Sequence, residues 1–345
     1  MASRIPILNT KILAPRRRDD LLSRPRLLDL LYELMDLRLI IVAAPAGYGK
    51  TSLLADFVQL GKLPCCWFSL DPLDQDVQRF AAHLIASIQG KYKKFGRTSL
   101  AALQNLNPDL NDLDSLAALI ANDIFQNVHD HFAIILDDYH LVEESRPVVN
   151  LINELIQRVD ENCHFVIASR TLLNLPDMTL LVARSQVGGL SFEELAFQTT
   201  EIQNLWLNNF HLSLSENEAA DLARETEGWI TGLILSRQMP GGLQADRLRG
   251  ARVSGVGLYD YLVQQVLERQ PSEVQRFMLR TSLLEEFDAD LCRDVIGSAL
   301  GIDENWDELV DSLLRANLFI QPVGEDHIYL RYHHLLRDFL ESCMQ

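Results

Sequence analysis

An apolar run that leads into a glycine-containing loop and then a helix, over residues 39–52, constrains the fold of this chain more than any other feature. The run before Pro45 is short and rich in β-branched residues, which predicts a buried parallel strand. Gly47 and Gly49 follow, and Gly-Lys-Thr opens the helix. This order is that of a phosphate-binding P-loop, because the glycines let the backbone turn its N–H groups toward anionic oxygens at a helix N-terminus.

The loop and the first helical turn carry the side chains that a nucleotide site needs. Lys50 can reach the β- and γ-phosphates as a point charge, and the Thr51 hydroxyl can ligate Mg²⁺. We therefore expect ATP or ADP to be bound, with Mg²⁺, by Ala46, Gly47, Tyr48, Gly49, Lys50, Thr51 and Ser52. The pattern departs from G-x-x-x-x-G-K-S/T at one place, where Ala44 replaces the first glycine. The alternative is a strand–turn–helix in which Gly-Lys-Thr occurs by chance.

Charge and composition argue against several classes of protein. The net charge of −17 at pH 7 opposes nonspecific binding to nucleic acid, so we expect no direct contact with DNA from this segment. No apolar run is long enough to span a bilayer, and the N-terminus lacks the apolar core of a signal peptide. The five cysteines form no C-x-x-C pair, and four lie in apolar contexts typical of reduced, buried thiols. These features predict a cytoplasmic protein without a membrane partner.

Charged residues follow two further apolar runs. The run over residues 132–136 ends in Asp137 and Asp138. At the carboxyl edge of a parallel sheet Asp137 would face the P-loop and hold Mg²⁺, while Asp138 would orient or deprotonate the attacking water. The run over residues 163–169 ends before Arg170, a cation that could sense the γ-phosphate. The alternatives are a solvated acidic turn after the first strand and an arginine in an exposed loop after the second.

Strands alternate with helices over residues 39–192, which predicts an α/β fold with a parallel, helix-flanked sheet. Besides the strand before the loop, strands are expected at residues 64–70, 132–136, 163–169 and 186–192. The expected helices, besides the one after the loop, span residues 25–37, 77–92, 114–128, 147–159 and 180–185, with Asp114 as a candidate N-cap.

The strand pattern stops after Phe197, and helices take over. They are expected from Thr200, from Ser215 to Gly228, and at residues 229–239, 258–269, 272–280, 290–296 and 306–316, with a loop or hinge at 240–257. Glu218 is the predicted capping-box partner of Ser215. Residues 318–323 and 328–332 predict a hairpin with a turn at 324–326, and a helix over 333–343 follows. Helices followed by such a hairpin are typical of a winged helix.

Several stretches together carry a family resemblance: AAPAGYGKTSLLADF, WFSLDPLDQDVQRF, IILDDYHLV, VIASR, TEGWITGL and RYHHLLRDFL. In this order they resemble the MalT-like signal transduction ATPases with numerous domains (STAND). The resemblance implies a P-loop NTPase domain over residues 1–197, a small helical domain over 198–255 and a winged-helix domain over 256–345. It also implies a switch, in which buried ADP holds a closed resting monomer, exchange for ATP promoted by an inducer opens it for self-association, and slow hydrolysis resets it.

The resemblance also assigns roles to residues. Lys50 and Thr51 match the Walker A pair, and Asp137 and Asp138 match the Walker B acid and its catalytic neighbour. Arg170 matches the sensor arginine.

Three further positions match family sites at greater distance from the loop. Arg24 corresponds to the position that borders the adenine, and His333 to the winged-helix histidine that touches the ADP β-phosphate, with His334 as a lesser candidate. The alternative for His333 is a capping or core histidine. Gly228-Trp229 lies where many relatives carry Gly-x-Pro beside the base, and this chain has no proline there.

Two features leave the biological role open. Full-length relatives continue into a helical-repeat sensor arm, and many end in a DNA-binding domain, so this chain is expected to be part of a longer regulator or an unusually short member. The alternatives to the switch are an ordinary turnover P-loop ATPase or phosphotransferase, and an interaction scaffold with structural nucleotide.

Three aspartates, Asp71, Asp74 and Asp76, also belong to the family pattern. Their expected use is helix capping and loop ordering.

Overall fold

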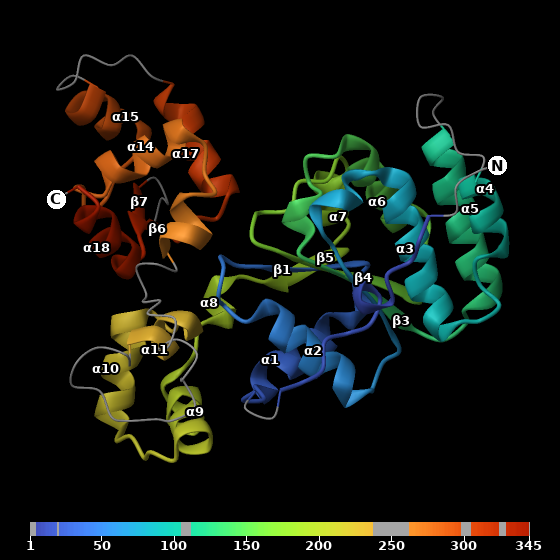
Figure 1. Ribbon diagram of the computed structural model, residues 1–345, viewed down its shortest axis with the longest axis horizontal. Helices are drawn as coiled ribbons and strands as arrows, with labels where there is room; N and C mark the ends of the chain where they lie inside the picture. Colours follow the sequence, from blue (N-terminus) through green and yellow to red (C-terminus); the bar gives the residue numbers. More distant parts are fainter. Residues whose placement is uncertain are drawn as a thin grey trace. The chain divides into compact units, whose positions relative to one another are not determined.

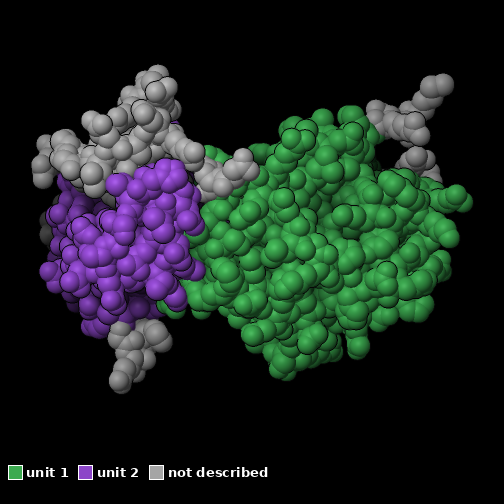
Figure 2. All heavy atoms as spheres, turned by 90° about the horizontal axis from the view of Figure 1, so that it is seen from below, with its two compact units in different colours: residues 1–43, 50–194 green, residues 44–49, 195–345 purple. Residues whose placement is uncertain are grey.

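The computed structural model describes residues 5–18, 21–104, 112–236, 262–297, 305–323 and 329–344. Its contacts divide the chain into two units, which Figure 2 colours separately. The first, which we call the sheet unit, comprises Met1–Ala43 and Lys50–Glu194. The second, the C-terminal unit, comprises Ala44–Gly49 and Leu195–Gln345. The finer domain limits at residues 197 and 255 stay predictions, because the segment 237–261 lies outside the described residues.

The sheet unit contains a five-stranded sheet in the order β2-β3-β4-β1-β5 (Figure 1). Its strands are β1 (Leu39–Ala43), β2 (Cys65–Ser69), β3 (Phe132–Asp137), β4 (Cys163–Ser169) and β5 (Val187–Leu190). Every neighbouring pair is parallel, so the predicted parallel sheet is confirmed. β3 and β4 are buried along their whole length because helices cover both faces, which explains their continuous apolar runs.

The position of β1 in the sheet determines where the phosphate-binding loop lies. β1 lies between β4 and β5, and the register pairs Ala43 with Ser169 at its carboxyl end. On the other side β5 approaches β1 so closely that a Cβ on Gly189 would lie 2.2 Å from the Ile41 carbonyl oxygen, so only glycine fits there. The chain therefore leaves β1 at the carboxyl edge, where parallel sheets bind ligands.

Helices α1 and α2 lie on one face of the sheet, and α6 and α7 lie on the other (Figure 1). The α-helices of this unit are α1 (Pro25–Glu33), α2 (Lys50–Leu60), α3 (Val77–Lys91), α4 (Arg97–Gln104), α5 (Asp112–Asn127), α6 (Arg146–Arg158), α7 (Met178–Ala183) and α8 (Phe192–Leu195). Short 3₁₀ turns are η1 (Asn9–Lys11), η2 (Leu34–Asp36), η3 (Pro72–Gln75) and η5 (Tyr139–Leu141). The expected Asp114 N-cap is wrong, because α5 already begins at Asp112 and Asp114 lies within its first turn.

The aspartates of the segment after β2 serve as caps, as predicted. Asp71 and Asp74 form a capping box on η3, and Asp76 caps α3 by accepting from the Arg79 amide. Asp74 is completely buried and is paired with Lys11 and with Arg79, whose Nε lies 3.0 Å from Asp74 Oδ1. These ion pairs fix the N-terminal segment and the β2–α3 connection together.

The described part of the C-terminal unit consists of helices, turns and a β-hairpin. Its described helices are α9 (Thr199–Phe210), α10 (Glu216–Thr226), α11 (Ile230–Ser236), α14 (Ser272–Thr281), α15 (Ala289–Cys292), α17 (Trp306–Arg315) and α18 (His334–Ser342). Two π-helical segments, η7 (Val263–Leu267) and η8 (Arg293–Gly297), were not expected from the sequence. Strands β6 (Ile320–Val323) and β7 (Tyr329–Tyr332) pair antiparallel, which confirms the predicted hairpin.

The helix ends in this unit follow the sequence signals closely. Ser215 and Glu218 form the expected capping box at the start of α10, and α10 ends at Glu227 and Gly228, which both adopt positive φ. His333 is the N-cap of α18 rather than its first residue. The hinge expected at 240–257 and the turn expected at 324–326 lie outside the described residues.

The state of the cysteines agrees with the sequence prediction. All five cysteines are free thiols, and Cys65, Cys66, Cys163 and Cys292 are buried. Within the described residues no helix combines the length and the apolar character needed to cross a membrane.

Candidate functional site

In the sheet unit the first helical turn after the loop meets the end of β3. Thr51 donates its hydroxyl to both oxygens of the Asp137 carboxylate, at 3.1 and 2.9 Å. Lys50 begins α2, and only 8% of its surface is exposed. Asp137 is 2% exposed at the carboxyl end of its strand. The structure therefore brings Thr51 and Asp137 together, and a hydroxyl and a carboxylate are hard oxygen donors of the kind that Mg²⁺ prefers.

Within the protein, burial disfavours the charged forms of both Asp137 and Lys50. Burial, and then the charge of Asp138, raise the pKa of Asp137 to about 7, although Thr51 and Lys50 act in the opposite direction. Burial, and then the neighbouring Arg170, lower the pKa of Lys50 to about 8 despite the two carboxylates. Both charged forms are disfavoured, so a bound cation at Asp137 and a bound anion at Lys50 would each be stabilised. These residues fit a Mg²⁺–nucleotide.

The remaining predicted residues of the sheet unit lie around this group. Asp138 adopts a left-handed conformation, with φ 60° and ψ 39°, and its carboxylate is 40% exposed. Non-glycine residues seldom adopt this conformation, and when they do it marks a position fixed by its surroundings. Arg170 follows β4 and is close enough to Lys50 to lower its pKa. Arg24 is 7% exposed at the N-cap position of α1, and Ser52 is exposed.

The loop Ala44–Gly49 has the backbone geometry of an anion-binding loop. Gly47 and Gly49 have φ of +81° and +82°, which only glycine adopts at no cost. Ala46 and Tyr48 are buried, at 7% and 3% exposure. Although the loop joins β1 to α2, it clusters with the C-terminal unit.

Within the C-terminal unit the loop is contacted by residues of distant segments. The indole of Trp229 donates to the Ala46 carbonyl at 3.0 Å, and the Thr231 hydroxyl donates to the Gly47 carbonyl at 3.0 Å. The Tyr48 ring packs on Phe319, with centroids 6.0 Å apart. No sequence signal predicts a role at the loop for Thr231 or Phe319, and Trp229 is expected only from its place in the Gly-x-Pro region beside the base.

His333, the predicted β-phosphate ligand, is buried and hydrogen-bonded at both ring nitrogens. Its Nδ1 accepts from the Leu335 amide at 3.2 Å, so Nε2 carries the proton and donates to the Thr226 carbonyl at 3.0 Å. Burial lowers its pKa, which favours this neutral form. Its ring lies 6.0 Å from that of Trp229 and 5.9 Å from that of Phe319. In this structure His333 therefore supports the two aromatic side chains nearest the loop.

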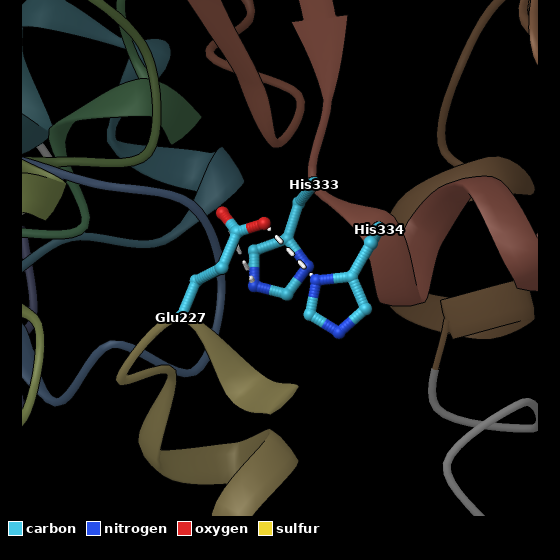
Figure 3. Close-up of side chains that lie close together, drawn as sticks. All are labelled: Glu227, His333 and His334. Carbon is cyan, nitrogen blue, oxygen red and sulfur yellow. Dashed lines mark hydrogen bonds and ion pairs between the residues drawn. The ribbon is translucent and has the colours of Figure 1, made fainter. Parts of the chain in front are cut away.

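Figure 3 shows His333 and His334 side by side with Glu227. The Glu227 carboxylate contacts His334 Nδ1 at 3.0 Å and His333 Nε2 at 3.9 Å. Among the described residues these three are the group of His, Cys, Asp and Glu whose donor atoms are close enough to hold a metal ion. Their hydrogen bonds explain the cluster without one. Burial opposes ionisation of Glu227, but the hydrogen bond from His334 and the nearby imidazoles lower its pKa to about 2.

Comparison with known proteins agrees with this architecture. Residues 263–345 match the family model of the MalT winged helix domain. The HTH-type transcriptional regulators MalT of Yersinia pestis (strain Pestoides F) and of Klebsiella pneumoniae are both 30% identical to this chain, in alignments of 347 positions that cover 98% of it. The chain is MalT-like. It spans 37% of the length of these curated relatives.

A solved structure supports the fold of this MalT-like chain over nearly its whole length. The Walker-type ATPase of Pyrococcus abyssi superposes with a TM-score of 0.60 at 17% identity, covering 95% of this chain and 98% of that one. The α/β P-loop fold followed by helices and a winged helix, as predicted, is thus confirmed.

Proposed function

We propose that this MalT-like chain is the nucleotide-binding switch of a transcriptional regulator. It binds ADP or ATP with Mg²⁺, hydrolyses ATP slowly and self-associates in the ATP-bound form. The observation that carries the proposal is the group of Lys50, Thr51 and Asp137 directly after a loop with two left-handed glycines. The names of the relatives support the regulatory context.

The residues of the sheet unit have distinct tasks in this proposal. Lys50 binds the β- and γ-phosphates, and Thr51 and Asp137 hold Mg²⁺, which neutralises phosphate charge when it is bound. Asp138 has a partly exposed carboxylate and orients or deprotonates the attacking water. Arg170 contacts the γ-phosphate, a role supported by its proximity to Lys50, whose pKa it lowers.

The other predicted contacts complete the nucleotide site. The amides of Ala46, Gly47, Tyr48 and Gly49 and the residue Ser52 surround the phosphates, and Arg24 borders the adenine. For His333 to touch the β-phosphate, its Nε2–H group would exchange one hydrogen-bond acceptor, the Thr226 carbonyl, for a phosphate oxygen. This exchange would couple the position of α18 to the nucleotide, as a switch requires.

The proposal also covers the sensing and output functions of the regulator. Because the chain spans 37% of its MalT relatives, we propose that the inducer-sensing arm and the DNA-binding output belong to the remaining length of such a protein. This segment then self-associates and makes no direct contact with DNA, in keeping with its net charge of −17.

The test begins with the purified chain. Its nucleotide content is released by denaturation and identified by ion-exchange chromatography, and its mass is measured by light scattering after incubation with ADP or with a non-hydrolysable ATP analogue. We expect ADP to co-purify, a monomer with ADP and a larger species with the analogue. Absence of any nucleotide binding would exclude the proposal. Rapid multiple-turnover hydrolysis by a monomer would indicate an ordinary P-loop ATPase.

A further inference from the structure

The carbonyl oxygens of the phosphate-binding loop are held by the residues that begin α11. Trp229 Nε1 donates to the Ala46 carbonyl at 3.0 Å. The Thr231 amide and hydroxyl both donate to the Gly47 carbonyl, at 3.3 and 3.0 Å. Two successive carbonyls thus accept three hydrogen bonds from a segment more than 180 residues away in the sequence, where the contact to Ala46 spans 183 positions.

These bonds fix the direction of the amides as well. No cis peptide occurs among the described residues, so in each peptide plane the N–H points opposite to the C=O. Holding the Ala46 carbonyl therefore sets the direction of the Gly47 N–H, and holding the Gly47 carbonyl sets that of the Tyr48 N–H. Both N–H groups point away from α11. Successive amides oriented in this way make an anion-binding concavity.

The donors themselves are rigidly placed. Trp229 is completely buried, and its ring packs edge-on against Phe319 at 5.0 Å. Its amide donates to the Thr226 carbonyl at 2.8 Å. A Cβ on Gly47 would lie 2.3 Å from Thr231 Oγ1, so the hydroxyl occupies the space that any side chain at that position would need. The loop and its donors therefore fit as one packed unit.

We infer that Trp229 and Thr231 are positioning residues of the nucleotide site, which aim the Gly47 and Tyr48 amides at the β-phosphate of a nucleoside diphosphate. This inference rests on the proposed nucleotide binding. Through these two residues the C-terminal unit sets how tightly the loop retains its ligand. Loss of either donor lets the corresponding peptide plane rotate, and the phosphate then loses an oriented amide.

Thr231→Val and Trp229→Phe test the inference, because each removes one donor; Thr231→Val keeps the shape of its side chain, whereas Trp229→Phe also removes one ring of a fully buried indole. The rate of ADP release is measured by displacing a fluorescent ADP analogue with excess ADP in the stopped flow. We expect release from Thr231→Val to be about five- to tenfold faster, the effect of one hydrogen bond when the backbone donor of Thr231 remains. Thr231→Ser keeps the hydroxyl and should release ADP at the wild-type rate.

Thr226→Val is the matched control. The Thr226 hydroxyl also makes a hydrogen bond, but donates to the Leu222 carbonyl within its own helix, so its removal should lower the melting temperature and leave ADP release unchanged. If Thr231→Val releases ADP no faster than Thr226→Val, while wild type binds ADP, the inference is wrong and the proposed function stands. If wild-type protein binds no ADP, the proposed function fails and the inference fails with it. If the Trp229→Phe protein does not fold, the comparison of Thr231→Val with Thr231→Ser alone decides the outcome.

Discussion

Two clusters of titratable side chains, one in each unit, differ in how the protein treats their charges. In the sheet unit, burial brings the pKa of Asp137 up to about 7 and that of Lys50 down to about 8, so both groups are pushed toward their neutral forms. In the C-terminal unit the pKa of Glu227 falls to about 2 and that of His334 rises, so both groups are held in their charged forms.

The difference distinguishes a ligand-binding site from an ion pair within the protein. A group whose charged form the fold disfavours gains from a ligand of opposite charge, and groups with such perturbed pKa values cluster at functional sites. A charge that the fold favours already has its partner, as Glu227 has in His334 at 3.0 Å. Removing a residue of the first kind should therefore affect binding and spare stability, whereas removing one of the second kind should cost stability.

The largest effect is expected at Lys50. Lys50→Met keeps the length of the side chain and removes its charge, so ADP affinity should fall by about 100-fold or more, since a buried charge–phosphate contact is lost. The melting temperature of the nucleotide-free protein should stay the same or rise, because burial disfavours the ammonium group that is removed. Calorimetric titration with ADP and differential scanning fluorimetry measure the two quantities.

Lys93→Met provides the control, because Lys93 is exposed on the surface of the same unit. It should leave both ADP affinity and melting temperature unchanged. A Lys50→Met protein that retained wild-type ADP affinity would contradict the assignment of Lys50. A marked loss of stability in that variant would instead contradict the comparison between the two clusters.

The sequence predicts the first cluster far better than the contacts of the second unit, for a physical reason. Asp137 ends one strongly patterned strand, Lys50 and Thr51 follow the loop after another, and parallel strands bring their carboxyl ends to one edge. No comparable pattern in the local sequence predicts the contact of Trp229 with Ala46, because the acceptor is a backbone carbonyl. The left-handed conformation of Phe319, with φ 55°, is equally invisible in the sequence, since it is imposed by tertiary packing.

A smaller effect is expected for Mg²⁺ as the pH changes. A carboxyl group with a pKa of about 7 must lose its proton before it can bind a cation, so Mg²⁺ affinity should fall as the pH drops below 7. Between pH 7.5 and 6 the expected decrease is about three- to tenfold, because the ionised fraction of a group with a pKa of about 7 falls by about that factor. The measurement is a titration of Mg²⁺ into the ADP complex at each pH.

Asp137→Asn separates this effect from the titration of ADP itself. Its Mg²⁺ affinity should be low at every pH and should follow only the change measured for ADP in solution. The nucleotide-free variant should also be more stable than wild type at pH 8, because ionising the buried Asp137 opposes folding above its ordinary pKa of 3.8. Wild-type and variant protein with the same pH dependence of Mg²⁺ binding would show that Asp137 is not the ligand.

The smallest effect is expected at the ion pair between Glu227 and His334. The hydrogen bond to Glu227 raises the pKa of His334 above 6.5, so the stability that the protonated imidazole contributes is fully present below pH 6.5 and is lost as the pH rises through the folded pKa. His334→Gln should therefore destabilise the protein by about 0.5–1 kcal/mol near pH 6 and by less near pH 8.5, a size set by the partial exposure of the pair. Urea unfolding at both pH values gives the difference.

His333 also faces this pair, and Asp338 acts on His334 from the same helix, but both are present in wild type and variant, so the difference between the two proteins isolates His334. His129→Gln is the control, because His129 is exposed, and its unfolding free energy should differ from wild type equally at the two pH values. The sign of the change at His334 is decisive. Because burial lowers the pKa of His333, its contribution has the opposite dependence and is lost as the pH falls. A His334→Gln difference that grew with rising pH would mean that the imidazole is held neutral, and Glu227 would then lack its charged partner.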